Sequence, residues 1–162
     1  MIKLNIKVMT LILFLILPAC SASNEKDASD SIFQVGIDEI ENVKVNKPFQ
    51  IVGYLKNSSK KTVEISHGSG MFSYEIYNEA GERILPNGNV LLEHAIGYQV
   101  EIRSGEEYRN NGQKQRSKEY YEFVIHQPGN YKVKTNVEFM MNNDGKQKKM
   151  RLSSESKEFK VQ

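Results

Sequence analysis

Apolar and polar residues alternate along most of the chain, the pattern of strands that bury one face. The alternating apolar sets are Phe33, Val35 and Ile37; Phe49, Ile51, Gly53 and Leu55; Val63 and Ile65; Phe72, Tyr74 and Ile76; Tyr98, Val100 and Ile102; Tyr121, Phe123 and Ile125; Tyr131, Val133, Val137 and Phe139; Met150 and Leu152; and Phe159 and Val161. No stretch of helical length carries an apolar stripe, and Leu91–Gly97 would form one helical turn at most. The pattern predicts an all-β domain over residues 31–162.

Turn signals separate these predicted strands. Asn78–Glu82 is a turn, and "NNDG" at Asn142–Gly145 predicts a tight hairpin. Gly68-Ser69-Gly70 lies between two alternating segments, where it predicts a bend or a bulge. Many short strands with turns between them indicate an antiparallel sandwich or barrel.

The segment "FVIHQPGNYKV" favours an immunoglobulin-like sandwich. It combines a strand, a Pro-Gly turn and Tyr131, two residues before the inward-facing Val133. In immunoglobulin-like domains, a tyrosine in this position bonds through its hydroxyl to the preceding turn. The alternative is that Tyr131 is a β-favoured aromatic in an ordinary hairpin.

The first 20 residues have the three zones of an export signal. Lys3 and Lys7 precede an apolar run from Val8 to Leu17, broken only by Thr10. About ten apolar residues are too few to span a bilayer, which needs about 20. Leu17-Pro18-Ala19-Cys20 resembles the lipobox of bacterial lipoproteins, which implies cleavage after residue 19 and a diacylglyceryl group on Cys20. The alternative is a core segment with a buried cysteine.

We therefore expect three regions: a signal peptide at 1–19, a lipidated flexible tether at 20–30, and the β-sandwich at 31–162. The small polar residues after Cys20 cannot bury enough apolar surface to become ordered. Two acyl chains hold a protein stably on a membrane, so the domain should stay at the cell membrane and face the extracytoplasmic side. Cleavage removes two lysines and no acid, which leaves 20 basic and 20 acidic residues. A balanced charge argues against general nucleic-acid binding.

Two stretches, "LKNSSKKTVEISHGSGMFSYEIYNEAGERI" and "QPGNYKVKTNVEF", resemble the BsuPI-type domain. That family takes its name from an intracellular proteinase inhibitor of bacilli and has an immunoglobulin-like β-fold. The matching positions, in order, are Asn57, Gly68–Gly70, Phe72–Tyr77, Gly81 and Pro128–Tyr131. The tryptophan that the family carries after the glycine turn is missing, and the segment from Leu85 to Lys118 is longer. The resemblance implies the fold and, more remotely, action on a protease.

No catalytic or metal-binding motif is present. His67, His94 and His126 fall in separate segments without ligand spacing, and His67-Gly68-Ser69-Gly70 lacks the order of a nucleophile elbow. A soft copper(I) site would draw on His67 and on four methionines, but their spacing favours core or rim packing. Those methionines are Met71, Met140, Met141 and Met150. We expect no enzyme activity and no cofactor.

Two polar segments could contact a partner. Lys146–Arg151, "KQKKMR", is either an edge strand that its lysines protect from aggregation or a patch that rests on anionic headgroups. Arg103–Lys118 has no apolar alternation and predicts a long loop, in which Tyr108, between Glu107 and Arg109, is the best candidate for contact. The sequence thus predicts a membrane-anchored, non-enzymatic module that binds an unknown protein partner and acts as a protease modulator. The alternative is a lipoprotein that binds a small ligand or a metal.

Overall fold

The computed structural model describes residues 32–85, 97–109, 122–143 and 145–162, which form twelve β-strands and no α-helix. The strands are β1 (Phe33–Ile37), β2 (Pro48–Gln50), β3 (Gly53–Asn57), β4 (Val63–His67), β5 (Phe72–Asn78), β6 (Arg83–Ile84), β7 (Tyr98–Ile102), β8 (Glu107–Arg109), β9 (Glu122–Val124), β10 (Gly129–Asn143), β11 (Lys146–Ser153) and β12 (Lys157–Val161). Within these residues, no helix is long and apolar enough to cross a membrane. The predicted all-β, immunoglobulin-like sandwich is confirmed.

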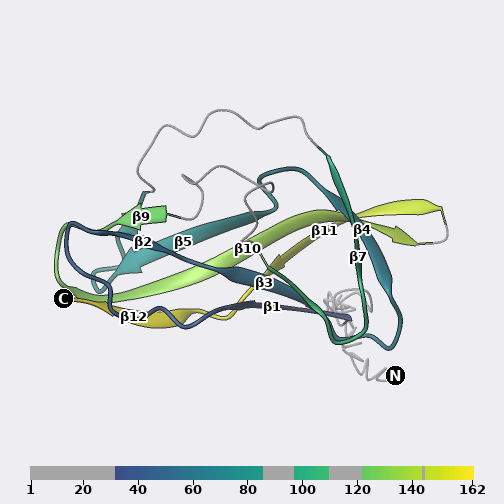
Figure 1. Ribbon diagram of the computed structural model, residues 1–162. Helices are drawn as coiled ribbons and strands as arrows, with labels where there is room; N and C mark the ends of the chain where they lie inside the picture. Colours follow the sequence, from purple (N-terminus) through teal and green to yellow (C-terminus); the bar gives the residue numbers. More distant parts are fainter. Residues whose placement is uncertain (1–31, 86–96, 110–121, 144) are drawn as a thin grey trace, which may run out of the picture.

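Strand β10 is the spine of the larger sheet (Figure 1). One of its edges pairs first with β5 and then with β4, and the other pairs with β12 and then with β11, all antiparallel. Beyond these, β6 extends the sheet from β5 and β7 extends it from β4. Both partner edges are interrupted, by residues 68–71 on one side and by residues 154–156 on the other. Gly68–Gly70 therefore lies in a bulge, as the sequence predicts.

The smaller layer is also built from strands that are interrupted along their length. β3 lies between β1 and β8, while β2 pairs with β9. β2 and β3 run in the same direction, separated by Ile51 and Val52, so the predicted Phe49–Leu55 strand is two strands instead of one. All four apolar positions of that pattern still face inward. Ile51 and Leu55 are fully buried, Gly53 is buried beside Tyr74, and the half-buried Phe49 packs against Phe123 and Phe159.

The two layers meet in one aromatic and aliphatic core. Phe33 of β1 packs edge-on against Phe139 of β10, with ring centroids 5.1 Å apart, and Phe123 of β9 packs against Tyr74 of β5 at 6.1 Å. Every second residue of β10 points into the core, and the residues between them are exposed or half-buried. The buried residues are Tyr131, Val133, Thr135, Val137, Phe139 and Met141. The inward sets predicted from the sequence are confirmed wherever the structure describes them.

The predicted tyrosine corner is also present. The Tyr131 hydroxyl donates a 2.9 Å hydrogen bond to the Gln127 carbonyl, four residues earlier, and the ring is stacked on Phe159. The predicted hairpin joins β10 to β11, with Asn143 paired to Lys146 and Gly145 at φ 77°. Glycine tolerates this left-handed conformation without the steric cost that other residues carry.

A second sequence prediction also needs correction. Arg103–Lys118 is not a continuous loop, because Glu107–Arg109 forms β8 and pairs with β3. Tyr108 points into the sandwich opposite Leu55, while Glu107 and Arg109 face out. β8 has only three residues, of which Tyr108 alone is apolar. The alternation of apolar and polar residues is therefore too short to be recognised in the sequence. The signal peptide, Cys20, the tether, residues 91–96 with His94, and residues 110–118 lie outside the described residues.

Candidate binding surfaces

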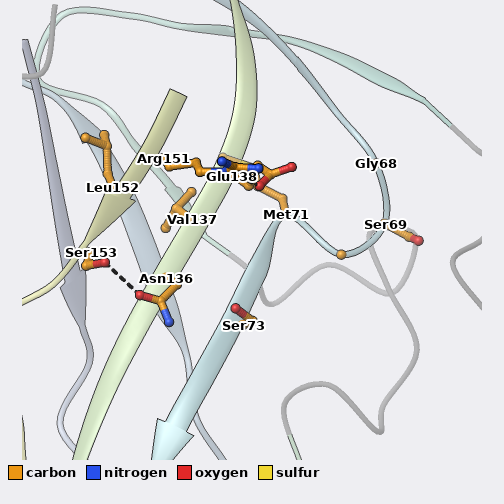
Figure 2. Close-up of a pocket in the computed structure, with 11 residues that line it drawn as sticks. Gly68, Ser69, Met71, Ser73, Asn136, Val137, Glu138, Arg151, Leu152 and Ser153 are labelled. Carbon is orange, nitrogen blue, oxygen red and sulfur yellow. Dashed lines mark hydrogen bonds and ion pairs between the residues drawn. The ribbon is translucent and has the colours of Figure 1, made fainter. Parts of the chain in front are cut away.

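The bulge between β4 and β5 opens a groove of about 700 Å³ on the outer face of the larger sheet (Figure 2). Its floor is formed by neighbouring strands, with Ser73 of β5 paired to Asn136 of β10 and Asn136 paired to Ser153 of β11. The Ser153 hydroxyl donates to Asn136 Oδ1 at 2.7 Å, and Asn136 Nδ2 donates to Glu75 Oε1 at 3.1 Å. These polar groups satisfy one another.

One wall of this groove is an ion-pair cluster. Glu138 accepts from Arg151 Nε at 2.8 Å and lies 2.5 Å from Lys149 Nζ. The hydrogen bonds from Lys149 and then Arg151 hold the pKa of the Glu138 carboxyl below its ordinary value. The cluster is exposed to water, so it contributes little to stability. Glu138 and Arg151 are the charged residues among those that line the groove, so its lining is neutral overall. Both are paired with each other, and Asn136 and Ser153 are also hydrogen-bonded to each other.

A buried histidine joins the two layers next to this bulge. His67 of β4 is stacked on Tyr98 at 5.3 Å, its Nδ1 lies 2.7 Å from the Gly68 carbonyl, and its Nε2 lies 2.9 Å from the Tyr108 hydroxyl. A carbonyl can only accept, so Nδ1 carries the proton and Nε2 accepts from Tyr108. Burial lowers the pKa of His67, and the bond to Gly68 opposes that shift. His67 is therefore a structural link between β4 and β8.

The outer face of the smaller layer carries an aromatic and charged cluster, which we call the Tyr54–Arg109 surface: Gly36, Asp38, Tyr54, Lys56, Glu107 and Arg109. The Tyr54 ring lies against Gly36, where an added Cβ would be 2.1 Å from Tyr54 Cζ. The Arg109 guanidinium lies 5.3 Å from the centroid of the Tyr54 ring, within the range of a cation–π contact. Glycine at position 36 is what lets the ring lie flat on the sheet.

Two carboxylates fix the guanidinium over this ring. Arg109 donates to Asp38, which follows β1, and to Glu107, two residues before it on β8. Lys56 Nζ lies 3.9 Å from the other oxygen of Glu107. The hydrogen bond to Asp38 is the main reason why the Arg109 pKa is raised. The Arg109 side chain is still 33% exposed and that of Asp38 40%, so the cluster is accessible from solvent.

The structure separates the residues that the sequence singled out. Glu107 and Arg109 belong to the Tyr54–Arg109 surface, whereas Tyr108 is half-buried against the core. Met71, Met141 and Met150 are in the core, and Met140 lies on the opposite face of β10 from Met141. Among the described residues, no three His, Cys, Asp or Glu side chains are grouped so that they could hold a metal ion. His126 is exposed, and its Nδ1 bonds to Asn46 Oδ1.

Sequence reasoning missed Gly36, Asp38 and Tyr54. These residues reach Arg109 only through the β1–β3–β8 pairing, and the separation of Asp38 and Arg109 by 71 residues gives no local signal. A glycine within the β1 alternation was the one available hint, since a glycine in a strand often marks a close approach.

Comparison with known proteins does not assign the chain to a family. No family model matches the chain, and no curated protein matches its sequence. Among solved structures, the chain is similar to the CARDB domain of a Pyrococcus furiosus protein, solved in complex with di-metal ions, at 13% identity and a TM-score of 0.38 over 80% of this chain and 86% of that one. It is also similar to the ASH/PapD-like domain 7 of human CEP192, at 10% identity and a TM-score of 0.37 over 86% of this chain and 89% of that one.

Proposed function

We propose that the protein is a non-enzymatic binding module that a lipid on Cys20 holds at the extracytoplasmic side of the cell membrane. The sequence Leu17-Pro18-Ala19-Cys20 after a short apolar run supports the anchor. In this proposal, the module binds a protein partner through the Tyr54–Arg109 surface.

The observation that carries this function is the fixed pairing of Tyr54 with Arg109. Tyrosine and arginine are enriched among the residues that dominate the energy of protein interfaces. Here the ring is supported by Gly36 and the guanidinium by Asp38 and Glu107, so little side-chain freedom would be lost on binding. An accessible, preorganised pair on the outer face of a sheet suits recognition of a partner and requires no catalytic group.

A protease is the partner class that we propose. The match of Asn57, Gly68–Gly70, Phe72–Tyr77 and Pro128–Tyr131 to the BsuPI-type pattern supports this choice. Modulation would follow from occupation of a surface on the protease, not from chemistry in this chain.

The test is a titration of the mature chain, residues 20–162 with Cys20→Ser, against bacterial extracytoplasmic and subtilisin-type serine proteases. We expect stoichiometric inhibition of at least one. Arg109→Ala should weaken it at least tenfold, because truncation of an interface hot spot costs about 2 kcal/mol or more. Arg151→Ala removes the same side chain from the other sheet and is the matched control.

Gly36→Ala gives a second variant that leaves the charges in place, because its Cβ displaces the Tyr54 ring. It should weaken inhibition without unfolding the domain. If no protease is inhibited while the chain stays folded and undigested, the protease proposal fails. Equal weakening by Arg109→Ala and Arg151→Ala would contradict the choice of surface.

A further inference from the structure

A second groove, of about 900 Å³, lies at the end of the sandwich where the described chain begins. Figure 1 shows the start of β1, the β3–β4 turn and the β10–β11 hairpin at this end, with the C terminus at the other. The apolar part of its lining is Ile32, Val63 and Met141, and its basic part is Lys61, Lys146 and Lys148. We refer to it as the basic groove.

The basic groove arises because β11 divides the "KQKKMR" cluster between two faces. Lys149 and Arg151 point to the outer face, where Glu138 binds both. Lys146 and Lys148 alternate with them and share the inward face with Met150, so they line the groove next to Met141. This division sends two lysines of the cluster toward the groove and places the other two beside Glu138.

The lining of the basic groove has an excess of positive charge. Among the described residues that line it, three are lysines and one, Glu64, is an acid, which accepts a 3.3 Å hydrogen bond from Asn142 Nδ2. Lys61 is set in place by the buried Asn57, whose Nδ2 donates to the Lys61 carbonyl at 2.7 Å. A polycationic rim over an apolar lining matches a phospholipid, which has an anionic phosphate above its acyl chains.

The start of the described chain places this groove within reach of a membrane. Ile32 lines the groove and is 12 residues from Cys20. Twelve residues span at most about 43 Å when fully extended, so an anchor at Cys20 keeps the groove near the bilayer surface. The positions of the lysines and of the chain entry thus agree.

We propose that the basic groove binds the headgroups of anionic phospholipids in the membrane that carries the anchor. It would orient the sandwich with the β10–β11 hairpin toward the bilayer and the C terminus away from it. This inference rests on the anchoring part of the proposed function and not on the protease partner.

The experiment measures binding of the unlipidated chain, residues 20–162 with Cys20→Ser, to vesicles of phosphatidylglycerol and phosphatidylcholine by co-sedimentation. We expect binding to these vesicles and none to pure phosphatidylcholine. The triple variant Lys61→Gln, Lys146→Gln, Lys148→Gln should bind about a hundredfold more weakly, because each basic residue near an anionic surface is worth about a fivefold change. At 1 M salt, where the Debye length is about 3 Å, binding should disappear.

The matched control is Lys44→Gln, Lys47→Gln, Lys160→Gln, which makes the same change of charge at the opposite end of the sandwich. It should lose less than about fivefold. An equal loss in both triple variants, or no binding by the wild-type chain, would overturn the proposal. If millimolar glycerol phosphate released the chain from the vesicles, the groove would bind free phosphate as well as lipid headgroups, and the proposal that it binds a membrane would fail. A failure here leaves protease inhibition by the same chain unaffected, so the two proposals fail separately.

A fluorophore gives an independent readout of orientation. An NBD label at Gln147→Cys should brighten on anionic vesicles, because it would enter the headgroup region, whereas a label at Gln162→Cys should not. The opposite result would show that the C-terminal end docks and would also overturn the proposal.

Discussion

Asn57 is the residue whose replacement tests the packing account most sharply. It is fully buried at the end of β3, where its Nδ2 donates to the carbonyls of Lys61 and Ile102 at 2.7 and 2.8 Å. Its Oδ1 accepts from the backbone N–H and the hydroxyl of Ser59 at 2.9 and 2.7 Å. One amide thus ties β3, the β3–β4 turn and β7 together.

The perturbation is Asn57→Asp, which keeps the shape and removes the two donors. At pH 7, a carboxylate oxygen would face two carbonyl oxygens in the interior, and we expect a loss of about 3–5 kcal/mol, the cost of an uncompensated buried charge. Asn57→Ala loses four hydrogen bonds of about 1 kcal/mol each, so its cost should be about 4 kcal/mol. For a domain of this size, either change lowers the Tm by about 10–20 °C.

The sign of the pH dependence separates the two variants. In Asn57→Asp, burial raises the pKa of the introduced carboxyl in the folded state above its unfolded value of about 3.9. The destabilisation is complete above the folded-state pKa and shrinks as the pH falls through it, since a protonated carboxyl regains one donor. Asn57→Ala should show no such change relative to the wild type.

Urea unfolding of the Cys20→Ser mature chain at several pH values measures these differences. Asn46→Asp is the control, because Asn46 is exposed and uses only its oxygen toward His126, so it should cost less than about 0.5 kcal/mol. If Asn57→Asp at pH 7 were as stable as Asn46→Asp, the hydrogen-bond network assigned to Asn57 would be refuted.

Three further predictions concern other parts of the chain. Tyr131→Phe removes the hydroxyl that donates to the Gln127 carbonyl and should lower the free energy of unfolding by about 1 kcal/mol. The urea midpoint should fall while the slope stays the same, and an unchanged midpoint would mean that this hydrogen bond does not stabilise the fold. Burial lowers the pKa of His67 in the folded state, so below pH 6.5 the unfolded state binds more protons than the folded state. The free energy of unfolding should therefore fall as the pH drops from 6.5 toward the lowered pKa of His67. His67→Gln should flatten this pH dependence, and an unchanged dependence would contradict a buried, neutral His67. We expect that Cu(I), Zn(II) and Ca(II) do not bind the folded protein and therefore leave its Tm unchanged. An ion that binds the native state raises the Tm, so a rise with any of the three would favour a metal-binding function.

The sequence predicts the strands well because burial in a two-layer sandwich follows the alternation of side chains. Phe33, Val133 and Phe139 could be assigned to the core from that alternation alone. Tyr131 could be assigned because the tyrosine corner has a local pattern, with its hydrogen-bond acceptor only four residues away.

The candidate surfaces could not be predicted, since they depend on strand pairing. Arg109 meets Tyr54 only because β8 lies beside β3, and the polar stretch around β8 hides a strand with one apolar residue. The basic groove is an intermediate case. The alternation of Lys146, Lys148 and Met150 could have placed both lysines on the inward face, but their proximity to Lys61 depends on how the β10–β11 hairpin and the β3–β4 turn meet at one end.

The central claim, a lipid-anchored module outside the cytoplasm, is tested most directly by labelling with fatty acid. Wild-type protein expressed in a bacterial host should incorporate labelled palmitate, fractionate with membranes and lose its first 19 residues. Cys20→Ala should remain an unlabelled, uncut precursor, while Ser21→Ala, the neighbouring control, should label as the wild type does. Label in Cys20→Ala, or none in the wild type, would contradict the account.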